Sequence, residues 1–200
     1  MRGSADPRPR GSGPILVRHS RSRPDPLRPA REWELSAGGW RLARELAETL
    51  APLEPDALFA SPETKARQTA SVIADRLRLE AVEVDELREH ERARVPFLSG
   101  EDEFRRRVHE LFDRPDERVF GEETAHEALE RFTAGLRGIL EGGAAGRPLV
   151  VTHGTVMSLY LGRRLGRSAR EVWDRLTMPC CVDLGREPEG SGGSPFFLSF

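Results

Sequence analysis

Residues 148–154 read Pro-Leu-Val-Val-Thr-His-Gly, and this short stretch carries the strongest fold signal in the 200-residue chain. Its apolar, β-branched run predicts a buried strand over Pro148 to Thr152. A helix is expected directly afterwards, from about Val156 to Leu165. His153 and Gly154 therefore lie where a buried strand passes into a helix, which is the repeating unit of an α/β fold.

The same unit is expected near the N-terminus. Pro14 to Val17 reads as a buried strand that ends at Arg18-His19-Ser20, and prolines then predict a long loop. Ser36 precedes a helical pattern that ends before Pro52. The remaining expected elements are a strand over Asp56–Ala60, a helix capped by Ser61 and running to about Leu77, a strand over Ala81–Val84, helices over about Glu101–Phe112, Glu122–Leu140 and Ala169–Leu176, a strand over Cys180–Leu184, and an edge strand over Phe196–Phe200.

Strands that alternate with helices favour parallel pairing, with helices on both faces of the sheet. We therefore expect a three-layer α/β sandwich with a mostly parallel central sheet. Residues 14–200 are expected to form one domain, preceded by a disordered leader over residues 1–13. Residues from about 90 to 121 are interpreted as a short insertion or cap over the site, and residues 185–195 as a flexible tail loop.

Composition argues against several classes of protein. A formal net charge of −2 gives no overall field for nucleic acid. No apolar run approaches the roughly 20 residues of a membrane span. The only cysteines, Cys180 and Cys181, are adjacent, so we expect no disulfide framework and a cytoplasmic location. No cluster has zinc-ligand spacing, so neither a metal nor another cofactor is expected.

Two histidines, His19 and His153, follow two buried strands. Because ligands of open α/β sheets bind beyond the carboxyl ends of the strands, both side chains are expected in one site. Arg18 adds a planar cation that suits phosphate oxygens. Lys65 adds a second cation, and it is the only lysine beside 30 arginines. Two imidazoles with two cations indicate an oxyanion substrate.

Four motifs in order carry a resemblance to the histidine phosphatase superfamily, which includes the cofactor-dependent phosphoglycerate mutases. The first two, residues 16–20 (Leu-Val-Arg-His-Ser) and 35–39 (Leu-Ser-Ala-Gly-Gly), resemble the family's strand ending in Arg-His-Gly and its Leu-Thr-x-x-Gly. Residues 60–70 resemble the segment Ser-Ser-x-x-x-Arg-Ala-x-Gln-Thr-Ala, and residues 150–154 the late Val-x-His-Gly. Residues 121–124 also resemble the family's Gly-Glu-Ser segment, which usually opens a helix.

The resemblance implies a mechanism. His19 would attack phosphorus and form a phosphohistidine, while Arg18 and His153 hold the phosphoryl oxygens. An acid would protonate the leaving oxygen and then activate water. Leu87-Arg88-Glu89 matches the family's Leu-x-Glu, so Glu89 is the expected acid, with Glu86 and Glu91 as rivals.

Two departures from the family pattern affect the phosphate-binding set. Ser20 stands where the family has glycine; its hydroxyl either donates to phosphate or serves the turn. Lys65 stands where the family has arginine, and it binds as a point charge rather than a fork. Arg67 is a substitute candidate, although on a helix its spacing turns it away from Lys65.

These residues predict a metal-independent phosphomonoester hydrolase of the histidine acid phosphatase type. Its substrate is expected to be a small phosphorylated metabolite or a phosphoprotein. One alternative is a mutase, which needs a lid that excludes water; the charged stretch of about 30 residues after Glu89 makes such a lid a poor fit. The other is a non-catalytic phosphate-binding module of the same fold.

Overall fold

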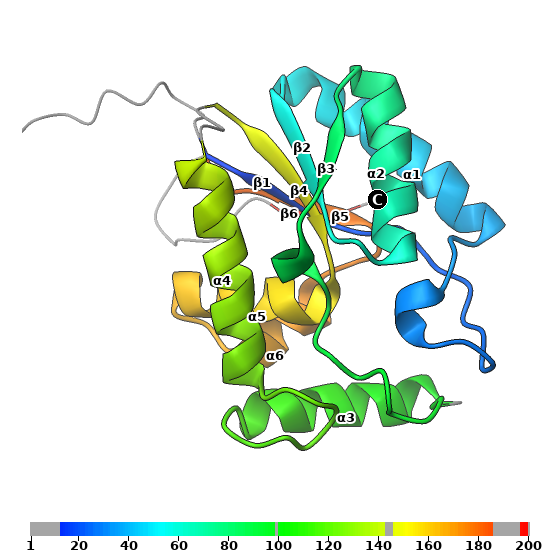
Figure 1. Cartoon of the computed structure of the whole chain (residues 1–200), viewed down its shortest axis with the longest axis vertical. Helices are drawn as coiled ribbons and strands as arrows, with labels where there is room; N and C mark the ends of the chain where they lie inside the picture. The colour runs from blue at the N-terminus through cyan, green and yellow to red at the C-terminus, as the bar shows by residue number, and fades with distance from the viewer. Residues whose placement is uncertain (1–12, 99, 143–145, 186–196, 200) are drawn as a thin grey trace, which may run out of the picture.

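The computed structural model describes residues 13–98, 100–142, 146–185 and 197–199. Its centre is a six-stranded sheet with the order β3-β2-β4-β1-β5-β6 (Figure 1). The strands are β1 (Ile15–Arg18), β2 (Ala57–Ala60), β3 (Ala81–Glu83), β4 (Pro148–Thr152), β5 (Cys180–Asp183) and β6 (Phe197–Ser199).

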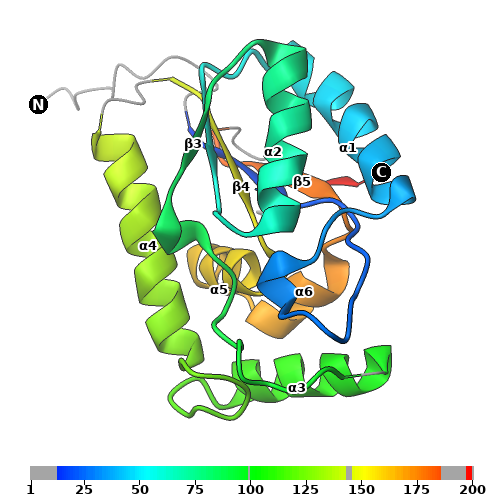
Figure 2. The ribbon, with the colours of Figure 1, turned by 45° about the vertical axis from the view of Figure 1, so that its right-hand side comes forward.

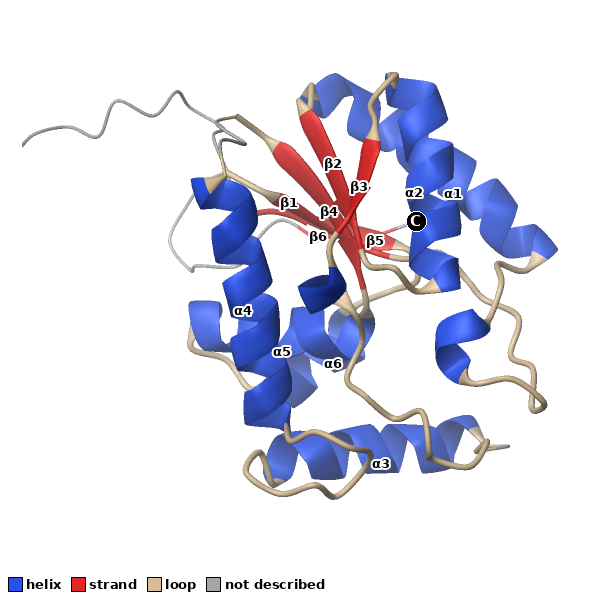
Figure 3. Ribbon diagram, in the orientation of Figure 1, coloured by secondary structure: helices blue, strands red, loops and turns tan. Residues whose placement is uncertain are grey.

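Helices cover both faces of this sheet (Figure 3). One face carries α1 (Ala37–Leu50) and α2 (Thr64–Leu77). The other carries α4 (Ala125–Glu141), α5 (Gly154–Leu165) and α6 (Ala169–Arg175), with α3 (Glu101–Asp113) packed beyond α6. Three short 3-10 helices, η1 (Ala30–Glu32), η2 (Ala51–Leu53) and η3 (Asp85–Leu87), complete the described elements. The expected three-layer sandwich is confirmed.

The alternation of side chains along β1 explains why two cores form. Ile15 and Val17 are fully buried against the layer of α1 and α2, whereas Leu16 is fully buried in the opposite layer. All five residues of β4 are buried, because this strand lies near the middle of the sheet. A strand buried on both faces reads as a continuous apolar run, as residues 148–152 do.

The sheet is mostly parallel, as expected, whereas two helix starts differ from expectation. β1, β2, β3 and β4 pair in parallel, but β5 runs antiparallel to β1. Ser61 does not cap α2, since that helix begins at Thr64 with Glu63 at its N-cap. α4 begins at Ala125 rather than Glu122, because Thr124 and Glu127 form a reciprocal capping box there.

Some expectations fall outside the described residues. Residues 1–12 of the predicted leader and residues 186–195 of the predicted tail loop are among them. The edge strand near the C-terminus is present as β6, which pairs antiparallel with β5. Within the described ranges, no helix combines the length and apolarity that crossing a membrane requires.

Two segments approach each other beyond the carboxyl ends of the parallel strands. The loop after β1 carries η1, which lies below the N-terminal end of α2 (Figure 2). The second segment follows η3 and leads to α3. Trp33 from the first and Phe97 from the second meet edge to face, with ring centroids 6.0 Å apart. The site described next lies at this edge of the sheet.

Candidate active site

His19 follows β1 directly and is 5% exposed. Its Nδ1 lies 2.8 Å from the carbonyl oxygen of Ser20, which can only accept a hydrogen bond. Nδ1 must therefore carry the proton, and Nε2 keeps its lone pair. Burial, with the neighbouring charges of His153 and Lys65, holds the pKa of His19 well below its usual value. The side chain is a neutral, oriented nucleophile candidate.

His153 follows β4, and its ring centroid lies 5.0 Å from that of His19. Its Nε2 is 2.7 Å from Ser61 Oγ, and that oxygen also accepts the backbone N–H of Glu63 at 3.3 Å. Burial, reinforced by Lys65 and opposed by Glu63, lowers the pKa of His153 to about 4. The imidazole is thus neutral near pH 7, and we assign the Ser61 hydroxyl as the donor of this hydrogen bond.

The proton of neutral His153 then resides on Nδ1. This atom is buried and has no hydrogen-bond partner among the described residues. Arg18 is the last residue of β1, and its Nε is also buried without a hydrogen-bond partner among the described residues. Its Nη1 donates to the carbonyl of Leu176 at 2.7 Å. Unpaired buried donors are costly, and an oxyanion is the partner that would satisfy both.

Gly154 permits this placement of Arg18. A Cβ at position 154 would lie 2.9 Å from three guanidinium atoms of Arg18, which is too close for a real contact. The glycine that begins α5 is therefore needed for the approach of a cation, and not for an unusual backbone angle.

Glu89 occupies the N-terminal end of α5. Its carboxylate accepts the backbone N–H groups of Thr155 at 3.1 Å, Val156 at 3.2 Å and His90 at 3.0 Å. Burial alone would raise the pKa of Glu89, but the charges of Arg92 and His153 and these hydrogen bonds bring it to about 2. These backbone N–H groups of α5 are thus occupied by a side chain.

Lys65 is buried, and its ammonium is already engaged. Nζ donates to Glu63 Oε2 at 2.5 Å and to the carbonyl of Ala30 in η1 at 2.8 Å. The other oxygen of Glu63 accepts the backbone N–H of Glu89 at 2.8 Å. Although burial opposes it, His153 and Lys65 keep the pKa of Glu63 far below its ordinary value.

Glu63 was not among the residues that the sequence predicted for the site. The structure makes it the link between the Lys65 ammonium and the backbone of Glu89. The sequence signal that could have identified Glu63 is its position two residues before the only lysine.

The structure does not bring two of the expected phosphate ligands to this site. Arg67 is exposed and pairs with Glu83 at 2.9 Å, because the helical spacing turns it away from Lys65. The Ser20 hydroxyl is buried and donates its single proton to the carbonyl of Gly39 at 2.7 Å. Ser20 therefore braces the start of α1 and has no donor left for phosphate.

The two rival acids make other contacts, although Glu91 lines the same cavity as Glu89. Glu86 is exposed, and its Cβ packs against Gly135 of α4. Glu91 accepts the backbone N–H of Ala93 and lies 3.8 Å from Arg88. Of the three candidate acids, Glu89 is the one whose carboxylate lies on α5 beside His153.

A cavity of about 430 Å³ opens beside these residues. Glu63, Lys65 and Glu89 contribute to its wall, together with η1 and residues 88–93. Arg92, which the sequence analysis did not single out, also lines it. Its Nη2 lies 3.9 Å from Glu89 Oε2.

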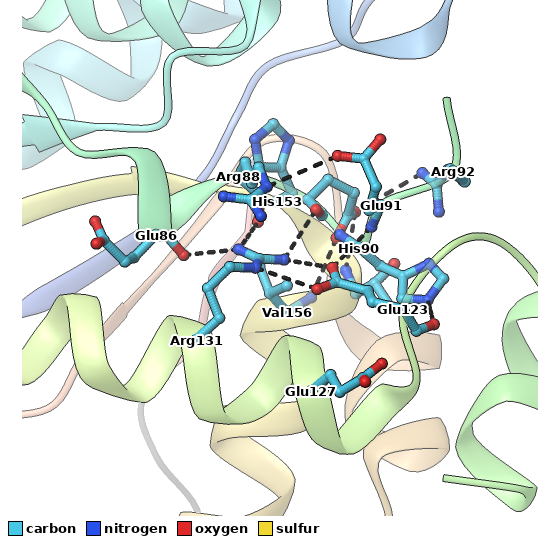
Figure 4. Close-up of polar contacts among 12 residues, drawn as sticks. Glu86, Arg88, His90, Glu91, Arg92, Glu123, Glu127, Arg131, His153 and Val156 are labelled. Carbon is cyan, nitrogen blue, oxygen red and sulfur yellow. Dashed lines mark hydrogen bonds and ion pairs between the residues drawn. The ribbon is translucent and has the colours of Figure 1, made fainter. Parts of the chain in front are cut away.

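Arg131 of α4 holds the Glu89 loop in place (Figure 4). Its guanidinium donates to the backbone carbonyls of Glu86 at 2.8 Å, Arg88 at 2.9 Å and Glu89 at 3.1 Å. It also donates to Glu123 at 2.5 Å, whose carboxylate accepts the N–H of Glu91. The segment expected only to open a helix thus also anchors the loop of the candidate acid.

Comparisons with known proteins agree with this architecture. The sequence model of the histidine phosphatase superfamily (branch 1) matches residues 15–190. The uncharacterized phosphatase PhoE of Bacillus subtilis (strain 168) is 27% identical over 150 residues, which cover 75% of this chain and 74% of that protein. The probable phosphoglycerate mutase GpmB of Klebsiella pneumoniae (strain 342) is 31% identical over 141 residues, 68% of this chain and 65% of that protein.

A solved structure, the mycobacterial glucosyl-3-phosphoglycerate phosphatase, superposes with a TM-score of 0.64 at 16% identity. The superposition covers 86% of this chain and 90% of that one, so the two share a fold. The family match extends over all the strands and helices from β1 to β5. With phosphatase and mutase relatives and with two histidines at the ends of β1 and β4, the chain belongs to the histidine phosphatase superfamily (branch 1).

Proposed function

We propose that the chain is a metal-independent phosphomonoester hydrolase that acts through a phosphohistidine on His19. The observation that supports this most strongly is the pair of neutral imidazoles with opposite tautomers. His19 presents a lone pair on Nε2, while His153 presents a buried N–H on Nδ1. One ring is prepared to attack phosphorus and the other to hold a phosphoryl oxygen.

In the first half-reaction, His19 Nε2 attacks phosphorus and the bond to the leaving oxygen breaks. Arg18 and His153 donate to the equatorial oxygens, where negative charge is spread in the transition state. Glu89 delivers a proton to the leaving oxygen. It is ionised in the free protein near pH 7, and the nearby phosphate dianion raises its pKa, so that the carboxylate takes up a proton when substrate binds.

In the second half-reaction, water attacks the phosphohistidine and the N–P bond breaks. Glu89, now a carboxylate, accepts a proton from the attacking water. Inorganic phosphate leaves, and His19 returns to its neutral form. The protein's own cations supply the charge stabilisation that this step requires.

The direct test is to replace His19 with alanine and measure hydrolysis of an aryl phosphate, together with formation of an acid-labile phosphoenzyme. Both should be lost. The His126→Ala protein is a matched control, because His126 is exposed and pairs with Asp116 far from the cavity wall. Wild-type turnover by His19→Ala would refute the proposal. Phosphate binding without turnover in the wild-type protein would instead favour a non-catalytic phosphate-binding module.

For the substrate, we favour a small phosphorylated metabolite over a phosphoprotein. The cavity volume of about 430 Å³ is within the range of small-molecule sites. A structural neighbour is named as a phosphatase of glucosyl-3-phosphoglycerate, a small phosphorylated metabolite. A hydrolysis screen of phosphorylated metabolites and phosphopeptides, with His19→Ala as background, decides between the two classes. The histidine acid phosphatase subtype stays a prediction.

A mutase is the second candidate, favoured by the 31% identity to a probable phosphoglycerate mutase. The contact of Trp33 with Phe97 also brings the two loops over the site together, as a mutase that excludes water requires. A coupled isomerisation assay on phosphoglycerate separates the candidates, since a hydrolase releases inorganic phosphate instead.

We place the protein in the cytoplasm. Cys180 and Cys181 are both free and buried in β5. Burial raises the pKa of Cys180 to about 11 and that of Cys181 to about 12, so neither is a reactive thiolate near pH 7. Buried unpaired thiols agree with a reducing compartment.

A further inference from the structure

Arg92 lies three residues after Glu89 and is held by two aromatic rings. Its guanidinium carbon is 4.9 Å from the ring centroid of Phe104 and 5.5 Å from that of Phe120. The side chain is 15% exposed and lines the cavity. The rings fix the position of the cation by stacking, but they do not satisfy its N–H groups.

The Arg92 guanidinium has N–H groups that no acceptor among the described residues satisfies. Nη1 is buried and finds no hydrogen-bond partner within the described ranges. Nη2 is 3.9 Å from Glu89 Oε2, a distance for charge attraction and too long for a hydrogen bond. Arg88 on the same cavity wall differs, because it donates to Asp85 and lies 3.8 Å from Glu91.

Lys65, which also lines the cavity, is less available to an anion than Arg92 is. Lys65 is committed to Glu63 and to the carbonyl of Ala30. The positive charge of Arg92 reaches Arg18, Glu89 and His153, so it acts within the same cluster as the candidate phosphate ligands. An unpaired, buried guanidinium in such a cluster is the group that an oxyanion would satisfy.

We propose that Arg92 is a substrate-binding residue, which donates from Nη1 to an oxygen of the bound phosphoester and thereby controls the protonation of Glu89. This inference rests on the proposed function. In the free protein the charge of Arg92 helps to keep Glu89 ionised. When a phosphate dianion neutralises that charge, the pKa of Glu89 rises and the acid becomes able to donate.

The experiment measures the dissociation constant of inorganic phosphate by calorimetry for three variants. Arg92→Met keeps an unbranched chain between Phe104 and Phe120 but removes the charge. We expect binding to weaken by about tenfold or more. Arg92→Lys keeps the charge without the planar fork, so a smaller loss of about threefold is expected. Arg118→Met is the matched control, because Arg118 is exposed and pairs with Glu127 outside the cavity wall, and its change should stay within about twofold.

A second readout separates binding from packing. Phosphate binding that protonates Glu89 takes up protons, so the calorimetric heat depends on the ionisation enthalpy of the buffer. This dependence should be clear in the wild-type protein at about pH 8, where free phosphate is already the dianion, and weak in Arg92→Met.

Wild-type phosphate affinity in a folded Arg92→Met protein would overturn the proposal, as would equal weakening by Arg118→Met. If Arg92→Met does not fold, Arg92→Lys decides the question on the same two readouts. These measurements need no turnover, so the Arg92 proposal can fail while His19-dependent hydrolysis stands, and the reverse outcome is equally visible.

Discussion

His153 Nε2 lies 2.7 Å from Ser61 Oγ, and this one contact determines which nitrogen of the ring carries the proton. The Ser61 oxygen accepts the N–H of Glu63, and we assign its single proton to the imidazole. The N–H of His153 therefore points away from Ser61, on the buried Nδ1. Ser61, which touches no substrate in this arrangement, thus sets which nitrogen of His153 can donate a hydrogen bond to the substrate.

Replacing Ser61 with alanine should allow His153 to change tautomer. Loss of one hydrogen bond worth about 1 kcal/mol or more predicts a fall in kcat of about fivefold or more. Nitrogen NMR of the labelled histidine reads the tautomer directly. Ser71→Ala is the control, because Ser71 is an exposed serine of α2. An unchanged tautomer together with unchanged kcat would contradict this role of Ser61.

Replacing Arg131 with methionine should loosen the Glu89 loop. Three backbone carbonyls lose their donor at once, so we expect kcat to fall by about tenfold or more. Phosphate affinity should change little, since Arg131 lies outside the cavity wall. Arg114→Met provides the comparison, because Arg114 pairs with Glu110 and Glu117 at the surface. Equal effects of the two changes on kcat would refute the anchoring role.

Replacing Gly154 with alanine should displace the Arg18 guanidinium, because the new Cβ would lie 2.9 Å from it. We expect the inhibition constant of phosphate to rise by about tenfold. At Gly138, also within a helix, a Cβ would meet nothing within 4 Å. Gly138→Ala should therefore raise the free energy of unfolding by about 0.5–1 kcal/mol and leave kinetics unchanged. Wild-type phosphate inhibition in Gly154→Ala would show that Arg18 accommodates the methyl group.

Replacing Glu63 with glutamine should strengthen phosphate binding. The change removes a negative charge from beside Lys65 while it keeps an oxygen for the N–H of Glu89. A tightening of the phosphate dissociation constant by about threefold or more is expected. Calorimetry measures it, and weaker binding would mean that Glu63 serves mainly to position Lys65.

Stability should fall in mild acid. The pKa of His153 is about 4 in the folded protein, against 6.5 as the usual value, so the unfolded chain binds more protons between these two limits. The free energy of unfolding is therefore expected to drop by about 3 kcal/mol from pH 6.5 to pH 4, with His19 acting in the same direction. Glu89 contributes a separate loss at lower pH, as its folded pKa of about 2 is approached.

Urea denaturation from about pH 7 to about pH 5 measures this dependence. The His153→Asn protein should show a flatter curve than the wild type, because it lacks one of the groups that titrate. Curves that run parallel over this interval would contradict the assignment of the effect to His153.

Local patterns were enough to predict the layers and the two histidines. β1 and β4 are apolar runs, and the histidine that follows each can be identified without knowing which strands pair. The direction of β5 was missed, because a short buried strand looks the same whichever way it runs. Arg131 and Arg92 were missed for a related reason. Their importance comes from carbonyls and rings elsewhere in the chain, and nothing in their own neighbourhood of sequence signals it.

The position of β1 in the sheet has a consequence for synthesis. This strand leaves the ribosome first, yet both of its neighbours, β4 and β5, belong to the last third of the chain. His19 therefore has no fixed position until β4 and β5 have been made. Pairings between such distant segments are slow to form, and the apolar run of β1 needs protection from other chains in the meantime. We expect the nascent protein to engage chaperones at this strand, and catalytic competence to arise only after β4 and β5 have been made.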